Sequence, residues 1–172
     1  MNIENAIKTA IEYETKVCDL YREAELEMKG ETGSRLIEAL YTDEQNHVKY
    51  LEDKLRKYRE DGSIVQDEII STLPSKEELE EEIRKLKTNM TGRTLGDKKK
   101  VLSKILKAEI ETSSFYRQMV GALSDEGKEL FSRFLEIEDA HVALVQAELD
   151  LYGNTGFWFG NKEIDMESLG ET

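Results

Sequence analysis

Residues 44–47, Glu-Gln-Asn-His, and residues 138–141, Glu-Asp-Ala-His, share the pattern Glu-x-x-His, and these two stretches decide the fold of the chain. They also contain both of its histidines. On a helix, residues three positions apart lie on one face, one turn from each other. Each stretch therefore offers a carboxylate oxygen and an imidazole nitrogen to the same point in space. Two such helices are what a dinuclear metal centre inside a four-helix bundle requires.

Apolar residues recur at alternating spacings of three and four in four segments of the chain, which is the period of an amphipathic helix. The segments span residues 3–28, 37–58, 102–123 and 131–152. Ser124 is placed to cap the start of the fourth segment. The Glu-x-x-His stretches fall on the second and fourth segments, so both are predicted to be helical.

The lengths of the connections set how the predicted helices pair. The links around residues 30–34 and 123–126 are short, so the helices on either side of each link should form antiparallel hairpins. Residues 61–97 form a long connection, in which a capping box predicts a short helix near residues 75–88. Two hairpins joined by one long crossover have the ferritin-like topology. We therefore predict an all-α, ferritin-like four-helix bundle.

The composition of the 172 residues suits one helical domain. Charged residues make up 35% of the chain, aromatic residues make up 8%, and there is one proline, which favours long amphipathic helices over an all-β fold. We predict a bundle domain over residues 1–152 and an aromatic C-terminal tail over residues 153–172. The tail contains the cluster at 157–159, Phe-Trp-Phe, which should be buried against the bundle or a partner chain.

Charge and hydropathy exclude several kinds of partner. The net charge of −13 argues against nucleic acid or an anionic membrane surface as the main partner. The sequence has no run of 18 apolar residues and no signal peptide at its N-terminus. The lone Cys18 excludes an internal disulfide and any Cys-x-x-Cys pair. We expect a cytoplasmic protein that forms a homodimer.

The two halves of the chain repeat each other. The Glu-x-x-His stretches are 94 residues apart, from position 44 to position 138. Glu14 is followed seven positions later by Tyr21, and the same spacing joins Glu109 to Tyr116 at an offset of 95 residues. Duplicated hairpins pack about a pseudo-two-fold axis, which brings matching side chains together at its centre. This arrangement suits two metal ions better than one.

Four glutamates and both histidines occupy apolar stripes, each about midway along a predicted helix: Glu14, Glu44, His47, Glu109, Glu138 and His141. Buried ionised carboxylates are costly unless they are paired or bound to metal. Divalent or trivalent cations would resolve the repulsion among four such groups. Carboxylate and imidazole ligands favour iron, manganese or zinc over soft metals. We therefore predict a site for two metal ions at these residues.

Two assignments stay open at this stage. Glu109 and Glu111 are two positions apart, so only one of them can face the core. The apolar stripe and the tyrosine spacing favour Glu109, while an alignment through the neighbouring Thr112 leaves Glu111 as the alternative. Tyr21 and Tyr116 are either ordinary core tyrosines, or residues that donate hydrogen bonds to metal-bound carboxylates or relay electrons.

The order Glu-x6-Tyr, Glu-x-x-His, Glu-x6-Tyr, Glu-x-x-His in four successive helices resembles the rubrerythrin branch of ferritin-like di-iron carboxylate proteins. The resemblance covers residues 3 to about 152. It implies a di-iron oxidoreductase that reduces peroxide or O2 as a peroxidase or ferroxidase, with Tyr21 and Tyr116 orienting carboxylates. It also implies that two iron ions, with manganese or zinc as possible replacements, bind Glu14, Glu44, His47, Glu109, Glu138 and His141.

The chain departs from rubrerythrins at two points. Thr112 stands where rubrerythrins typically carry an extra ligand glutamate, which bears on the ligand exchange associated with their peroxidase chemistry. The chain also lacks the Cys-x-x-Cys pairs of a rubredoxin domain, so turnover would need an external electron-donor protein. Two alternatives to the enzyme remain: a metal-binding or iron-handling protein without turnover, and a purely structural helical module.

Overall fold

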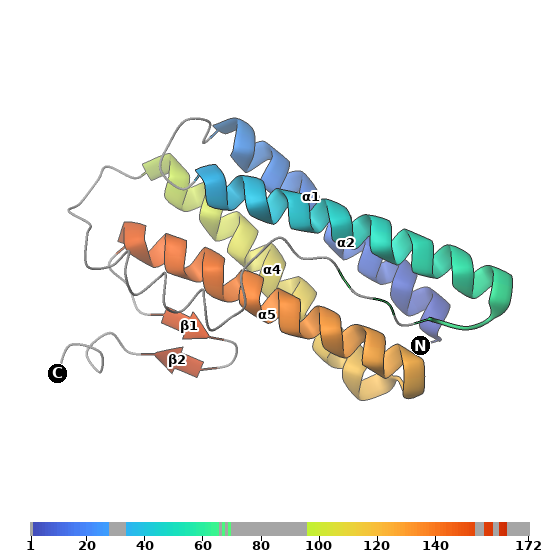
Figure 1. Ribbon diagram of the computed structural model, residues 1–172. Helices are drawn as coiled ribbons and strands as arrows, with labels where there is room; N and C mark the ends of the chain where they lie inside the picture. The colour runs from blue at the N-terminus through green and yellow to red at the C-terminus, as the bar shows by residue number, and fades with distance from the viewer. Residues whose placement is uncertain are drawn as a thin grey trace.

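The computed structural model describes residues 2–27, 34–65, 67, 69, 96–153, 157–159 and 162–164 of the chain. Within these residues the chain forms four long helices, α1 (Ile3–Glu27), α2 (Ser34–Asp61), α4 (Gly96–Ala122) and α5 (Asp125–Gly153). The helices lie side by side and make an all-α four-helix bundle (Figure 1). This architecture confirms the fold class predicted from the periodicity of the sequence.

The C-terminal end of helix α2 follows from local chemistry. Helix α2 ends at Asp61, and the next residue, Gly62, has a φ of 71°, a left-handed conformation that glycine adopts without steric cost. The Gly62 amide donates to the carbonyl of Tyr58 at 2.8 Å, which satisfies one of the last carbonyls of the helix. Helix α5 begins at Asp125, directly after the predicted capping residue Ser124.

The helices pair as the connection lengths predict. Helix α1 packs against α2, α4 packs against α5, and α1 also packs against α4. Helix α2 ends at the opposite end of the bundle from the start of α4 (Figure 1). The short helix predicted near residues 75–88 lies outside the described residues. The division into residues 1–152 and 153–172 stays a prediction.

The first residues of the long connection lie against α2 and α5. Ile64 is buried, and its amide donates to the carboxylate of Glu126 at 2.9 Å. The buried ammonium of Lys54 on α2 donates to the carbonyl of Val65 and to the carboxylate of Asp67. Since a buried ammonium is costly unless it is paired, these bonds hold the segment against the bundle.

Two apolar clusters fill the bundle, one on each side of a polar layer. On α1, for example, Ala10 belongs to one cluster and Val17 to the other, with Glu14 between them. On each of the other three helices, the buried glutamates and histidines likewise lie between residues of the two clusters. Each fully buried large apolar side chain contributes about 1.5–3 kcal/mol, which offsets the cost of the polar layer. Among the described helices, none is both long and apolar enough to cross a membrane.

The tail contains a short hairpin that the sequence pattern did not predict. Strand β1 (Phe157–Phe159) pairs antiparallel with β2 (Lys162–Ile164) and lies beside α5 (Figure 1). Strands of three residues are too short to show a period of two, which is why the pattern gave no signal. The expectation that the aromatic cluster is buried concerns side chains outside the described part of the structure.

Candidate metal centre

The structure places all six of the predicted ligands in the polar layer between the two apolar clusters. Their side chains are fully buried. Helices α1 and α4 each contribute one glutamate, and α2 and α5 each contribute a glutamate and a histidine one turn apart: Glu14, Glu109, Glu44, His47, Glu138 and His141. Four helices therefore bring four carboxylates and two imidazoles to one level of the core.

His47 directs its Nδ1 atom at three carboxylates. The atom lies 3.3 Å from Oε2 of Glu14, 3.5 Å from Oε2 of Glu44 and 3.6 Å from Oε1 of Glu138. These glutamates come from α1, α2 and α5. The imidazole thus faces carboxylates of three different helices.

His141 repeats this pattern from the opposite helix. Its Nδ1 atom lies 2.8 Å from Oε1 of Glu44 and 3.8 Å from the Oε1 atoms of both Glu109 and Glu138. The rings of His47 and His141 lie nearly parallel, at 13°, with their centroids 5.4 Å apart. Each imidazole therefore faces both Glu-x-x-His glutamates and one glutamate of a flanking helix.

The two Glu-x-x-His pairs form the tightest part of the cluster. One ligand atom from each of Glu44, His47, Glu138 and His141 can be chosen so that all four lie within 4.8 Å of one another. A group this compact and this buried could hold a metal ion. Glu14 approaches this group at His47, and Glu109 approaches it at His141.

The hydrogen bonding of the layer fits a metal centre. Both oxygens of Glu138, Oε2 of Glu44 and Oε2 of Glu109 have no hydrogen-bond partner among the described residues. Buried polar atoms are normally hydrogen-bonded, and an unpaired buried charge is costly. A cation would satisfy these oxygens. Oxygen and imidazole donors together suit iron, manganese or zinc.

The crowding of charge shifts the pKa values in the layer. Burial and the nearby charge of Glu44 raise the pKa of Glu109 to about 7. Burial and the charges of Glu14 and Glu44 raise the pKa of Glu138 well above its usual range. Burial alone would lower the pKa of His47, but the carboxylates of Glu14 and Glu44 raise it to about 9. A metal ion that binds here must displace the protons that these groups hold.

Tyr21 and Tyr116 are fully buried and each donates its hydroxyl to a carboxylate of the layer. Tyr21 of α1 donates to Glu109 of α4, and Tyr116 of α4 donates to Glu14 of α1. Burial first, and the neighbouring carboxylates next, raise the pKa of both phenols well above their usual value, so both keep their protons. The crossed hydrogen bonds fix the orientation of the two flanking carboxylates.

The structure separates the two candidates on α4. Glu109 lies in the buried layer, whereas the side chain of Glu111 is 39% exposed and pairs with Lys16 at 2.7 Å. Thr112 is buried, but its hydroxyl donates to the carbonyl of Ala108 at 3.0 Å, so it bonds to its own helix. Glu109 is therefore the α4 glutamate that faces the histidines.

Asp43 is a buried residue of the site that the sequence analysis missed. It is fully buried, and its Oδ2 atom lies 3.7 Å from Nε2 of His141. It directly precedes Glu44, and only Glu44 of the two was assigned to the apolar stripe, although Asp43 also lies three residues after Leu40 and four before His47. The available signal was an acid immediately before a Glu-x-x-His stretch.

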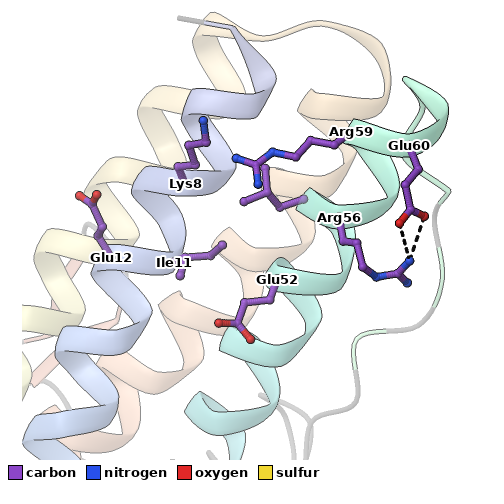
Figure 2. Close-up of a pocket in the computed structure, with 8 residues that line it drawn as sticks. Lys8, Ile11, Glu12, Glu52, Arg56, Arg59 and Glu60 are labelled. Carbon is purple, nitrogen blue, oxygen red and sulfur yellow. Dashed lines mark hydrogen bonds and ion pairs between the residues drawn. The ribbon is translucent and has the colours of Figure 1, made fainter.

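A surface groove lies between α1 and α2, away from the polar layer. Figure 2 shows Lys8, Ile11 and Glu12 on α1 beside α2, on which Arg56 and Glu60 are joined by an ion pair. None of the six predicted ligands lines this groove. The groove therefore belongs to the outer surface of the bundle.

Comparisons with protein-family models, with curated proteins and with solved structures returned no match to this chain. Fold and site together define an all-α four-helix bundle with a buried glutamate and histidine cluster that could hold a metal ion.

Proposed function

We propose that the chain is a di-iron carboxylate oxidoreductase of the rubrerythrin type, which reduces peroxide or O2 with electrons from an external donor. One observation carries the proposal: a sealed layer in which four helices direct four carboxylates and two imidazoles at one another. The repeated motifs support it, because duplicated ligand sets suit two ions. The motif order resembles that of rubrerythrins, and iron is the metal this resemblance implies.

The contacts suggest a division of labour among the ligands. Glu44 and Glu138 approach both imidazoles, so these two carboxylates would help to hold metal beside either histidine. Glu14 approaches only His47 and Glu109 only His141, so each would serve one ion. Tyr21 and Tyr116 would hold these two carboxylates in place, and the apolar clusters would exclude water.

Bound iron would supply the redox chemistry, passing electrons to peroxide or O2. A donor set rich in carboxylates stabilises the ferric state, which favours that direction of electron transfer. The chain has one cysteine and no Cys-x-x-Cys pair, so repeated turnover needs an external electron-donor protein.

The first test is the metal content of the purified full-length chain. We expect about two iron or manganese ions per chain and a sharp fall in the double variant Glu44→Ala/His47→Ala. The second test adds peroxide to the anaerobic, iron-loaded chain and follows oxidation by stopped-flow absorbance. We expect oxidation much faster than that of ferrous iron in buffer, and an equal rate would refute the proposal.

A second candidate is a metal-binding or iron-handling protein without turnover. The buried Thr112 favours it, because a threonine bonded to its own helix occupies the place of the extra ligand of rubrerythrins. Steady consumption of peroxide with a supplied reductant separates the two candidates. A binding protein would show at most one stoichiometric reaction per loaded site.

A further inference from the structure

The six predicted ligands obey the internal repeat of the chain. Each histidine Nδ1 faces the two Glu-x-x-His glutamates and one flanking glutamate, and the repeat exchanges these two sets. The tyrosine hydrogen bonds follow the same repeat. Tyr21, in the first half of the chain, donates to Glu109 in the second half, and Tyr116 in the second half donates to Glu14 in the first. The set of carboxylates that faces His47 therefore matches the set that faces His141.

The repeat breaks one residue before each Glu-x-x-His stretch. Asp43 occupies this place on α2, and the offset of 94 residues puts Ile137 at the matching place on α5. Asp43 is fully buried, and its Oδ2 atom lies 3.7 Å from Nε2 of His141, an ion-pair contact. Nε2 is the ring nitrogen that does not face the glutamates, so Asp43 lies on the side of the imidazole away from the glutamates.

His47 has an apolar neighbour in place of this support. Nε2 of His47 and Nε2 of His141 both lack a hydrogen-bond partner among the described residues, and of the two only Nε2 of His141 makes an ion-pair contact there, with Asp43 at 3.7 Å. The ring of Phe134 packs edge-on against the imidazole, with centroids 5.4 Å apart and an angle of 78°. Ile137, at the place that matches Asp43, is half-buried and carries no acceptor.

We propose that the two metal positions are unequal, and that Asp43 makes the position beside His141 fill first. Asp43 acts as a positioning residue: it holds the imidazole of His141 and does not contact the metal itself. The inference rests on the proposed dinuclear centre, but it concerns the order and affinity of metal binding and makes no claim about peroxide.

The physical reason lies in the proton of the imidazole. A neutral histidine that binds metal through Nδ1 carries its proton on Nε2. A carboxylate that accepts this proton fixes the tautomer, orients the ring and strengthens the metal bond, and loss of such a partner costs roughly 10–100-fold in metal affinity. Asp43 would accept the proton of His141 by closing from 3.7 Å to hydrogen-bond distance, whereas the matching proton of His47 would be buried with no carboxylate beside it in the described part of the chain, which is itself costly. Both effects favour the position beside His141.

The test is an anaerobic titration of the metal-free, full-length chain with Co(II), followed by visible absorption and by calorimetry. We expect two ions to bind in two steps whose dissociation constants differ by roughly 10–100-fold. In Asp43→Asn the first step should weaken about tenfold or more, while the second stays unchanged, so the two steps approach each other.

Two further sets of variants locate the steps. Ile137→Asp in the Asp43→Asn background supplies a carboxylate behind His47, and we expect it to separate the two steps again. Glu109→Gln and Glu14→Gln are a matched pair related by the repeat. We expect Glu109→Gln to weaken the tight step and Glu14→Gln to weaken the other, a result that does not depend on how well Ile137→Asp folds.

Asp139→Asn is the control, because Asp139 also adjoins a Glu-x-x-His glutamate but pairs with Arg117 at 3.0 Å and with Ser113 at 2.6 Å. We expect both of its cobalt steps to match the wild type. Binding of two ions in one step, or equal weakening of both steps in Asp43→Asn, would overturn the inference alone. Absence of any cobalt uptake would overturn the dinuclear centre as well.

Discussion

A carboxylate at the centre of a helical bundle has to be compensated, and Glu138 illustrates the problem. Neither of its oxygens has a hydrogen-bond partner in the described structure, although Nδ1 atoms of both histidines lie 3.6 and 3.8 Å from Oε1. An apolar residue of similar volume would give an equally or more stable bundle. Stability alone therefore does not explain a glutamate here, whereas metal binding does.

The tyrosine hydrogen bonds are testable by deletion of one oxygen atom. Tyr116→Phe leaves a buried oxygen of Glu14 without its donor, and such a loss costs about 1–3 kcal/mol. Tyr21→Phe should cost a similar amount, because it removes the matching bond to Glu109. Chemical denaturation of both variants measures the loss in the free energy of unfolding. A cost near zero in either variant would mean that its phenol merely packs.

The metal-free chain should lose stability as the pH rises. Glu109 has its pKa raised from 4.5 to about 7, and His47 has its pKa raised from 6.5 to about 9. Between pH 4.5 and 9 the folded state therefore binds more protons than the unfolded state, so the free energy of unfolding falls with rising pH. The lowered pKa of Glu14 acts in the opposite direction, but only below its ordinary value of 4.5.

Melting temperatures of the metal-free chain across this range measure the slope. Added metal should reverse it, because metal binds the deprotonated ligands and binding strengthens as protons leave. A metal-free chain whose melting temperature rises steadily from pH 5 to pH 9 would contradict the raised pKa values of the buried groups Glu109 and His47.

At the scale of whole elements, one buried side chain helps to hold the start of the long connection against the bundle. Lys54→Met keeps the apolar stem but removes the ammonium that bonds to Val65 and Asp67. We expect faster amide hydrogen exchange in residues 63–69, with the helices little changed, because the helices keep their own packing. Mass spectrometry of exchanged peptides makes the measurement.

Lys57→Met is the matched control for this variant. Lys57 is about one turn from Lys54 on α2, but it is partly exposed, pairs with Asp53 at 2.7 Å and reaches Asp67 only at 4.0 Å. Exposed ion pairs contribute little to stability, so exchange in residues 63–69 should stay as in the wild type. Equal exchange in both variants would show that the buried ammonium does not hold the segment.

The elements differ in how far the sequence predicts them. The helices were predictable because each must keep one apolar face, which leaves a period of three and four along some 25 residues. The same periodicity marked Glu14, Glu44, Glu109 and Glu138, since an acid on an apolar stripe is conspicuous. The strands of the tail left no comparable signal, because three residues are too few.

Contacts between helices lay beyond the reach of periodicity. The stripes placed Tyr21 and Tyr116 in the core, but the crossing of their hydrogen bonds depends on how α1 packs against α4. Asp43 and Lys54 were not assigned to the predicted stripes and are buried because a residue of another element meets each of them. Such pairings are properties of the packed bundle and of no single segment.

At the scale of the whole molecule, two apolar clusters enclose the charged layer, so metal binding and folding should be linked. A ligand that binds only the folded state stabilises it by about 2.7 kcal/mol at a hundred times its dissociation constant. We expect the wild type to melt at a clearly higher temperature with excess Mn(II) than without it.

In Glu44→Leu/His47→Leu, which replaces two polar groups by apolar ones, the metal response should vanish. Without metal, this variant should melt at or above the wild-type temperature. Calorimetric scans of both chains, each with and without Mn(II), test the two statements together. A wild type that melts at one temperature in both conditions would favour a purely structural bundle over a metal centre.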